Sequence, residues 1–156
     1  HLNSSGEAHM VDVSDRDVSD RASTAAGFVS LRPETITAIR DARLPKGDVL
    51  STARIAGIQA AKRTPDLIPL CHPIAVHGVD VDVSLAGVQG ARFVEIVATV
   101  RTADRTGVEM EALTAASVAA LTVYDMIKAI DRGAVIGPTQ LMEKSGGASG
   151  SWRRDG

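Results

Sequence analysis

Cysteine and aromatic side chains are nearly absent from this sequence of 156 residues. Its one cysteine, Cys71, cannot form an internal disulfide, which is typical of proteins in a reducing compartment, so we expect a cytoplasmic location. Aromatic residues make up 3% of the chain and the formal net charge is −2, which leaves little for stacking on bases or neutralising a phosphate backbone. Nucleic acid is therefore not an expected partner.

Long apolar runs and secretion signals are also missing. No stretch reaches the roughly 18 apolar residues of a transmembrane helix, so no membrane partner is expected. The length and the hydrophobic content of 44% suit one globular domain with a real core. A small anionic ligand is compatible with the low net charge, because local clusters of cations act at short range.

Three regions divide the chain. Residues 1–20 are polar and acidic with few large apolar side chains, which predicts a flexible N-terminal arm. Residues 21–145 are expected to form a single α+β domain that carries the candidate catalytic residues. Residues 146–156 are expected to form a flexible C-terminal tail.

The spacing of apolar residues and the positions of proline, glycine and helix-capping residues predict the helices and strands of this domain. The clearest strand is 79–85, where valine and leucine alternate with aspartate and serine. Asp48 is a suitable N-cap for a helix, whereas the prolines in 64–73 argue against a regular helix there. The expected elements, in order, are strand 22–31, helix 33–42, helix 48–62, strand 79–85, a turn at 87–90, strand 92–101, helix 109–131 and strand 134–141.

This order of elements matches the split βαβ arrangement. The predicted fold class is α+β and ferredoxin-like, with an antiparallel four-stranded sheet and the helices packed on one face. Pro138 lies inside the last strand and cannot donate a ladder hydrogen bond. That strand is therefore expected at an edge of the sheet or with a bulge.

The helix predicted over 109–131 is the most informative segment. Its thirteen residues from Ala112 to Tyr124 carry no charge, whereas a surface helix usually keeps a polar outer face. We infer that another subunit covers this helix, so the chain is expected to form an oligomer. The alternative is a helix enclosed within one domain.

Asp125 and Lys128 share one face of this helix, close to its end. Taken alone, such a pair is a surface ion pair worth about 0.2–0.5 kcal/mol. Here it follows a long uncharged run, which favours a position at the mouth of a partly dry cleft. A desolvated lysine can act as a general acid or base while the aspartate holds it in place, so both are candidate catalytic residues.

Glu109 and Glu111 lie at the beginning of the same helix, where carboxylates interact favourably with the helix dipole. Fourteen residues separate Glu111 from Asp125, which corresponds to about 21 Å along a helix. One small-molecule site within a single subunit can hardly use both ends. If both ends serve one site, they must belong to different subunits.

Three further residues could contact an anion. His72 lies between two prolines in LIPLCHPI, so it is either a structural histidine or one that a rigid loop presents to an anion or a proton-transfer step. Lys46 precedes a glycine at a helix start and Lys144 precedes a Ser-Gly-Gly loop, and both arrangements can bind phosphate, although neither matches a P-loop. With Lys128 they offer enough positive charge for a polyphosphate. No histidine or cysteine spacing suits a metal ion, so no metal site is expected.

These segments resemble the molybdenum cofactor biosynthesis protein C family, whose members are cyclic pyranopterin monophosphate synthases. The similarity runs from GEAHMVDVS (6–14) through KGDV, ARIAGIQAAKRT, DLIPLCHPI and TGVEMEALTAASVAALTVYDMIKAI to EKSGG. It covers nearly the whole chain, and its motifs are specific.

The resemblance implies a lyase that converts (8S)-3',8-cyclo-7,8-dihydroguanosine 5'-triphosphate to cyclic pyranopterin monophosphate and pyrophosphate. It also implies a ferredoxin-like homohexamer, a trimer of dimers, with active sites between subunits. No cofactor is implied, although Mg²⁺ can accompany a triphosphate. The positions that it marks as catalytic are Asp125, Lys128 and Lys46, and those that it marks as substrate-binding are Leu70, Cys71, His72, Glu109, Met110, Glu111 and Lys144.

This reaction explains the residue types. Opening the guanine-derived ring and rebuilding it as a pterin needs several proton transfers, for which Asp125 and Lys128 are hypothesised to act as a coupled acid–base pair. Lys46, Lys144 and His72 would neutralise the triphosphate and the leaving pyrophosphate.

Two positions depart from the family pattern. Ala148 stands where many members carry a second lysine, in KSGGKSG, and Arg105 stands where lysine is frequent. The first weakens any requirement for a cation at 148, and the second keeps the charge. Two other functions stay open, a non-catalytic ferredoxin-like regulatory module that binds a nucleotide, and an RNA-binding protein of related topology, which the low aromatic content disfavours.

Overall fold

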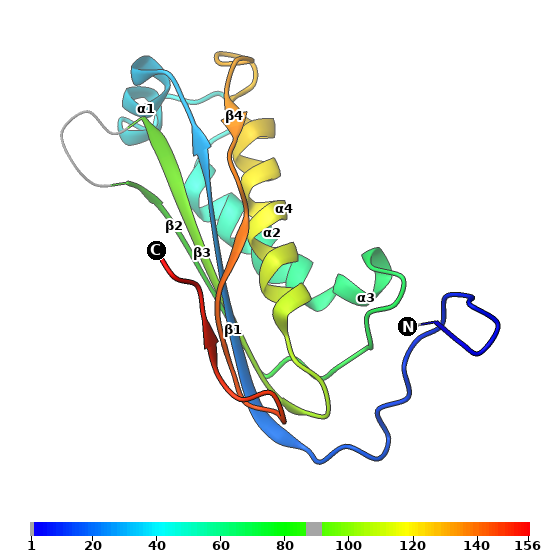
Figure 1. Cartoon of the computed structure of the whole chain (residues 1–156). Helices are drawn as coiled ribbons and strands as arrows, with labels where there is room; N and C mark the ends of the chain where they lie inside the picture. Colours follow the sequence, from blue (N-terminus) through cyan, green and yellow to red (C-terminus); the bar gives the residue numbers. More distant parts are fainter. Residues whose placement is uncertain (1, 87–91) are drawn as a thin grey trace.

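Helices cover one face of an antiparallel sheet in the computed structural model, which describes residues 2–86 and 92–156 (Figure 1). The strands are β1 (Ser19–Ser30), β2 (Gly78–Leu85), β3 (Phe93–Asp104), β4 (Val135–Ile136), β5 (Gln140–Ser145) and β6 (Trp152–Arg153). The helices are α1 (Pro33–Arg40), α2 (Val49–Lys62), α3 (Thr64–Leu67) and α4 (Glu109–Ile127). The α+β class is confirmed. The turn predicted at 87–90 lies outside the described residues.

The strand order β2-β3-β1-β5 places β1 between β3 and β5, as in the four-stranded sheet of ferredoxin-like domains. All of these neighbours are antiparallel. Two short strands enlarge the sheet beyond the expected four, because β4 pairs with the end of β1 and β6 pairs with β5. The described residues thus form a six-stranded sheet. β6 belongs to the predicted C-terminal tail, whose mobility stays a prediction.

The last predicted strand is divided in two, which corrects the single strand expected over 134–141. β4 and β5 are separated by a segment that contains Gly137 and Pro138. Gly137 donates its backbone N–H to the carbonyl of Phe28, but Pro138 has no N–H with which to continue the ladder. Strand pairing therefore stops at the proline and resumes in β5.

A second correction concerns 64–73, where no regular helix was expected. One helical turn, α3, forms at Thr64–Leu67. Pro65 occupies the first turn of α3, where the N–H that proline lacks would have no partner within the helix. The helix ends at Leu67, and the stretch from there to His72, which contains Pro69, is irregular.

Two predicted helix starts are confirmed. α1 begins at Pro33, as expected, although it ends at Arg40 rather than at 42. Asp48 caps α2, because its carboxylate accepts hydrogen bonds from the backbone N–H of Ser51 at 3.0 Å and from the Ser51 hydroxyl at 2.6 Å. This cap fixes the point at which the loop carrying Lys46 turns into α2.

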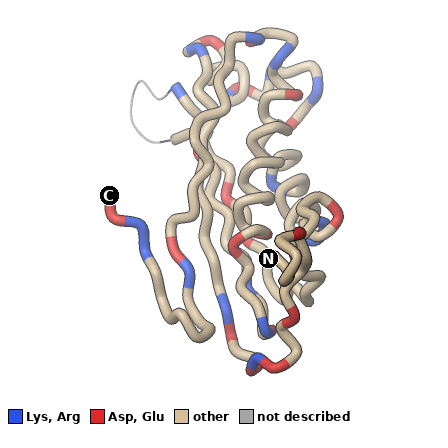
Figure 2. The backbone as a smooth tube through the Cα atoms, turned by 45° about the vertical axis from the view of Figure 1, so that its right-hand side comes forward, with Lys and Arg blue, Asp and Glu red and all other residues tan. Residues whose placement is uncertain are grey.

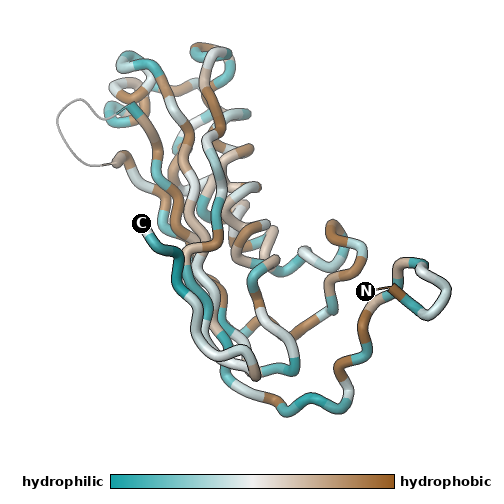
Figure 3. Tube along the Cα trace, in the orientation of Figure 1, coloured by the Kyte–Doolittle hydropathy of each residue, from teal (hydrophilic) through white to brown (hydrophobic). Residues whose placement is uncertain are grey.

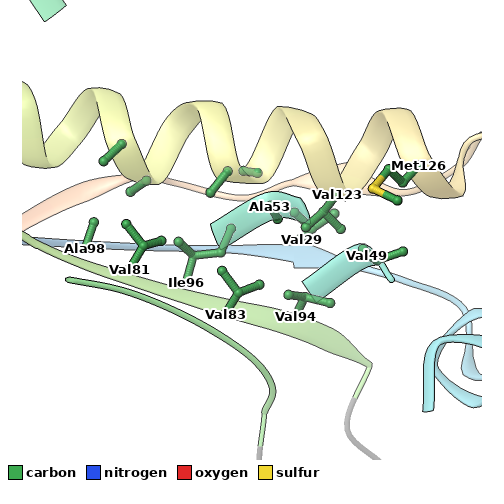
Figure 4. Close-up of a cluster of buried hydrophobic side chains, with 14 of the residues drawn as sticks. Val29, Val49, Ala53, Val81, Val83, Val94, Ile96, Ala98, Val123 and Met126 are labelled. Atoms are coloured by element: carbon green, nitrogen blue, oxygen red, sulfur yellow. The ribbon is translucent and has the colours of Figure 1, made fainter. Parts of the chain in front are cut away.

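The core lies between the sheet and the helix pair α2 and α4 (Figure 4). Val81, Val83 and Ile96 point into it, whereas Asp80 and Asp82 are exposed on the other face. The predicted alternation of β2 is thereby confirmed. Figure 3 shows hydrophobic residues concentrated in the central strands and a hydrophilic C-terminal segment.

α4 is enclosed by the sheet and α2 on its inner side only. Small residues allow this close packing, since a Cβ added to Gly57 of α2 would lie 3.1 Å from the Ala115 carbonyl oxygen of α4. The outer side is partly open, with Leu121 57% exposed and Val118 half-buried. By length and composition alone α4 could cross a membrane, but 56% of its apolar window is buried, as in the core helix of a folded domain.

A buried carboxylate holds the end of α4 against α1. Asp131 is 2% exposed and accepts hydrogen bonds from the Arg32 backbone N–H at 2.9 Å and the Thr35 hydroxyl at 2.8 Å. Burial alone would raise the pKa of this carboxyl, but the hydrogen bonds from Arg32 and Thr35 lower it below its usual range. The turn after α4 is therefore anchored to the start of α1, whose other end leads to Lys46.

Candidate active site

The candidate residues form two clusters at opposite ends of α4, and Figure 2 shows charged positions gathered toward the ends of this helix. The lysine–aspartate cluster, at the C-terminal end, consists of Lys46, Asp125 and Lys128. The second cluster surrounds the N-terminal end of α4 and contains the other candidates, which are Leu70, Cys71, His72, Glu109, Met110, Glu111 and Lys144. One chain does not bring the two clusters together.

In the lysine–aspartate cluster, one carboxylate holds two ammonium groups. Lys46 Nζ lies 2.8 Å from Asp125 Oδ2, and Lys128 Nζ lies 2.7 Å from Asp125 Oδ1. Lys46 also donates to the backbone carbonyl of Asp125 at 3.1 Å. All three side chains are about half exposed in the single chain, so the cluster is open to a ligand or to a neighbouring subunit.

These contacts decide the charge of Asp125. Hydrogen bonds from Lys128 and then Lys46 lower the pKa of the Asp125 carboxyl to about 2. At neutral pH the carboxylate is therefore ionised and is a weak base. In the cluster it contacts both ammonium groups and thereby fixes the positions of the two lysines.

The second cluster encloses a pocket of about 240 Å³, which we call the His72 pocket. Its wall combines the loop after α3 with the first turn of α4. His72 contacts the carbonyl oxygen of Val11 through Nε2, so this nitrogen carries the hydrogen. The proline-rich loop thus presents the imidazole toward the N-terminal arm and the start of α4. The residues lining the pocket are Val11, Val13, Arg16, Leu70, Cys71, His72, Thr106, Gly107, Glu109, Met110 and Glu111.

Glu111 is the buried acid of this pocket. It is 1% exposed, and its Oε1 accepts a hydrogen bond from the Cys71 thiol at 3.4 Å. Its Oε2 is buried with no hydrogen-bond partner among the described residues. Burial raises the pKa of Glu111, and burial followed by the charge of Glu111 raises the pKa of Cys71 to about 12. The thiol is therefore protonated at neutral pH and is a hydrogen-bond donor rather than a nucleophile.

Replacing Glu111 with glutamine is expected to raise Tm by a few degrees at pH 8, since about 1 kcal/mol shifts Tm by 2–4 °C in a domain of this size. Because the folded-state pKa of Glu111 is raised, its contribution to stability is complete at low pH and is lost as pH rises through the folded pKa. The gain should therefore shrink toward zero at pH 4. Thermal unfolding at both pH values measures it. Glu95→Gln, at an exposed position of β3, is the control and should show no such pH dependence.

A larger cavity of about 800 Å³ adjoins the His72 pocket, and we call it the Lys144 cavity. The two share Arg16, Thr106, Gly107 and Glu109 in their walls. Lys144 Nζ lies 3.4 Å from Glu109 Oε1 and donates to the Ser149 hydroxyl at 2.7 Å. Glu109 therefore stands between the two spaces. The remaining lining residues are Asp15, Asp17, Ser19, Arg21, Lys144, Gly147, Ala148 and Ser149.

The sequence reasoning missed the contribution of the N-terminal arm. Val11, Val13 and Arg16 line the His72 pocket, although they belong to the segment predicted to be a flexible arm. Arg105 holds the arm through Nη1, which donates to the carbonyl of Arg16 at 2.8 Å and also to that of Ser14. No local pattern in residues 1–20 indicates this contact, because its partner lies 89 residues away.

Taken together, the fold and these clusters describe an α+β domain whose charged side chains are of the types that can bind a small anionic molecule and exchange protons with it. The described residues contain no group of three or more histidine, cysteine, aspartate and glutamate side chains placed to hold a metal ion. Lysines, a histidine and a buried glutamate supply the polar groups. This set fits an enzyme that works on a phosphorylated ring compound.

Comparison with known proteins gives the family. The profile of the MoaC family matches residues 10–147, and the chain belongs to this family. A cyclic pyranopterin monophosphate synthase of Streptomyces avermitilis is 58% identical over 154 residues, which are 99% of this chain and 88% of the relative. That of Thermomicrobium roseum is 57% identical over 155 residues, covering 99% and 92%. Cyclic pyranopterin monophosphate synthase 2 of Mycobacterium tuberculosis is 54% identical over 154 residues, covering 99% and 90%.

Proposed function

We propose that this protein is a cyclic pyranopterin monophosphate synthase. It converts (8S)-3',8-cyclo-7,8-dihydroguanosine 5'-triphosphate to cyclic pyranopterin monophosphate and pyrophosphate in molybdenum cofactor biosynthesis. The observation that carries the proposal is the identity of 54–58% with synthases of this name over 99% of the chain. The geometry supports it, because the chain offers a lysine–aspartate cluster suited to proton transfer and a cavity with lysine and arginine side chains in its wall.

The two adjoining spaces suit the two halves of such a substrate. The His72 pocket is the smaller and presents an imidazole, a thiol and a buried carboxyl, which can hydrogen-bond the edge of a heterocycle. The Lys144 cavity is the larger and has cationic side chains in its wall, as a triphosphate needs. Glu109, between them, lies near the junction of ring and phosphate.

Proton transfer is assigned to the lysine–aspartate cluster. Asp125 is anionic and fixes the positions of Lys128 and Lys46. In place of a coupled pair with equal roles, we therefore assign different roles to the aspartate and the lysines. A lysine donates or accepts the proton, and Asp125 holds it in position and balances its charge. Lys46 approaches from a different loop, which places a second ammonium group beside the first.

One active site then needs two subunits. The lysine–aspartate cluster and the His72 pocket lie at opposite ends of α4, so a substrate that touches both must bind between chains. The outer side of α4 supports such an association, because it offers Leu121 and Val118 rather than charged residues. Ile55, on the adjacent α2, is another exposed apolar side chain. The proposed assembly is a homohexamer built as a trimer of dimers.

The remaining parts of the proposal concern the environment of the enzyme. No resident cofactor is proposed, and Mg²⁺ would enter only with the triphosphate. The protonated, half-buried thiol of Cys71 is compatible with the cytoplasm, where we place the protein. Neither nucleic acid nor a membrane is a proposed partner.

A coupled assay with the cyclised GTP intermediate tests the function. The protein is expected to release pyrophosphate and to form a product that oxidises to a fluorescent pterin, with the two signals in equal amounts. GTP itself is the control substrate and should give neither signal, because the ring to be rebuilt is formed before this step. Absence of both signals with the cyclised substrate, from folded protein, would refute the proposal.

A further inference from the structure

The lysine–aspartate cluster takes its two ammonium groups from two separate elements. Lys128 is the C-cap residue of α4, whereas Lys46 lies in the loop that joins α1 to α2. The Asp125 carboxylate lies between them, 2.8 Å from Lys46 Nζ and 2.7 Å from Lys128 Nζ. Both lysines are about half exposed, so packing around their side chains does little to hold them in place. Their separation therefore depends on how α1 and its loop are attached to the end of α4.

Lys46 is attached to α1 by a loop that folds back on the helix. The Arg43 N–H donates to the Ala38 carbonyl inside α1 at 2.9 Å. Ala42 has a left-handed φ of +53°, which turns the chain sharply at the end of the helix. The side chain of Leu44 then enters the core, where it is buried. The helix and the loop thus form one unit, and a shift of α1 would displace Lys46.

The other end of α1 is held by Asp131. Arg32 occupies the N-cap position, but an arginine side chain has no acceptor with which to cap a helix. Asp131 supplies the acceptor from 96 residues further along the chain than Thr35, since its Oδ2 accepts from the Arg32 N–H at 2.9 Å and from the Thr35 hydroxyl at 2.8 Å. Its Oδ1 forms an ion pair with Arg32 Nε at 3.3 Å. The carboxylate is 2% exposed and Thr35 is 1% exposed, so water has no access to replace either partner.

The backbone of Asp131 belongs to the turn that ends α4. Its N–H donates to the Ile127 carbonyl at 2.9 Å, and the Ile130 N–H donates to the same carbonyl at 3.0 Å. The Ile130 carbonyl accepts a hydrogen bond from the Arg32 guanidinium. Lys128 lies within this turn, so the same bonds fix its backbone. Asp131 therefore joins the end of α4, through its backbone, to the start of α1, through its side chain, and Figure 1 shows both at one end of the molecule.

We propose that Asp131 is a positioning residue for the lysine–aspartate cluster, which sets the place of Lys46 relative to Asp125 and Lys128 by joining α1 to α4. Its side chain is enclosed, so it acts through the two lysines and not on a ligand. That this geometry matters for turnover rests on the proposed function. That Asp131 sets the geometry rests on the contacts of α1 and α4. The alternative is a carboxylate that stabilises the fold and leaves the cluster unchanged.

A crystal structure of Asp131→Asn tests the positioning without substrate. Asparagine keeps the oxygen that accepts from Thr35, but its amide NH₂ would face the Arg32 guanidinium, donor against donor. We expect α1 to shift away from the end of α4 and to carry Lys46 with it. In the wild type, Lys46 Nζ lies 2.8 Å from Asp125 Oδ2. In the variant these atoms should be more than about 4 Å apart, beyond the reach of an ion pair.

Steady-state kinetics with cyclised GTP measure the effect on turnover. Asp131→Asn should lower kcat about 10–10²-fold with little change in KM, because a displaced lysine no longer meets the reacting atoms. Val83→Ala is the matched control, since it removes buried side-chain atoms from β2. Both variants should lower Tm. Below its Tm, however, Val83→Ala should keep the wild-type kcat and the contact between Lys46 and Asp125.

Two substitutions of Thr35 separate the hydrogen bond from packing. Thr35→Val keeps the size of the side chain but removes the hydroxyl that Asp131 accepts from, so kcat should fall several-fold. Thr35→Ser removes a methyl group but keeps the hydroxyl, so it should retain most of the wild-type kcat. A role in packing alone would give the opposite order, because the serine leaves the larger space.

The outcomes separate the positioning role from the proposed function. Wild-type kcat and an unchanged contact between Lys46 and Asp125 in Asp131→Asn would overturn the proposal. If that variant does not fold, a lower kcat in Thr35→Ser than in Thr35→Val would overturn it. An equal loss of kcat in Val83→Ala would also overturn it, because the effect would then follow stability alone. A displaced Lys46 in Asp131→Asn, together with a wild-type protein that does not turn over cyclised GTP, would support the positioning and refute the proposed function.

Discussion

Replacing Lys128 with alanine is expected to lower kcat for cyclic pyranopterin monophosphate formation by about 10²–10⁴-fold, the usual worth of a positioned general acid or base. Lys128 Nζ lies 2.7 Å from Asp125 Oδ1, and the Asp125 carboxyl, with a pKa of about 2, has no proton to give at neutral pH. The proposed proton transfer is therefore assigned to the lysine of the pair. Steady-state kinetics should show kcat and kcat/KM falling together, because the lost interaction acts in the transition state.

Two further variants separate proton transfer from charge. Lys128→Arg keeps the positive charge beside Asp125 but cannot release a proton near neutral pH, so it should be almost as inactive as Lys128→Ala. Lys62→Ala removes an exposed lysine from the last turn of α2 and should behave as the wild type. Because Lys128 is half exposed, its removal should leave Tm nearly unchanged. Recovery of most activity in Lys128→Arg would contradict the acid–base role and favour an electrostatic one.

Local sequence signals were sufficient for most of the fold. The alternation of Val81 and Val83 with aspartates identifies β2, and Asp48 marks the start of α2, because both signals act within a few residues. β6 was missed because its two residues become a strand only by pairing with β5. The prolines of 64–73 argue against a helix, yet α3 forms there because Pro65 stands in a first turn, where proline is tolerated.

The candidate site was predictable in its residue types but not in its contacts. Lys46 and Asp125 are 79 positions apart, so no helical or strand spacing relates them. The sequence indicated for Glu111 a favourable interaction with the helix dipole, but not its contact. In the structure, Glu111 is buried against Cys71, and Glu109 lies near Lys144. Burial of a carboxyl depends on how α4 packs on the sheet and the loop after α3. Such tertiary effects have no local signature.

Mixing two inactive variants is expected to restore about a quarter of the wild-type activity if each active site is shared between chains. Lys128→Ala damages the lysine–aspartate cluster, and His72→Ala damages the pocket at the other end of α4. In a mixed pair, one site receives both damaged ends and the other receives both intact ends. Random assembly of equal amounts makes half of the pairs mixed, so roughly one site in four is intact. Co-expression with two different tags and sequential purification gives the mixed oligomers for the assay.

The matched control combines His72→Ala with Glu111→Ala, which damage the same end of α4. No arrangement of these two chains produces an intact site, so their mixed oligomers should stay inactive. All three variants are expected to be inactive alone. The two mixtures therefore differ only in whether the damaged residues lie at opposite ends of α4 or at the same end. If mixed oligomers of Lys128→Ala and His72→Ala are isolated and show no recovery, both clusters must act within one chain or not in one site. The distance along α4 excludes the first for a single small substrate, so that result would contradict an active site shared between chains.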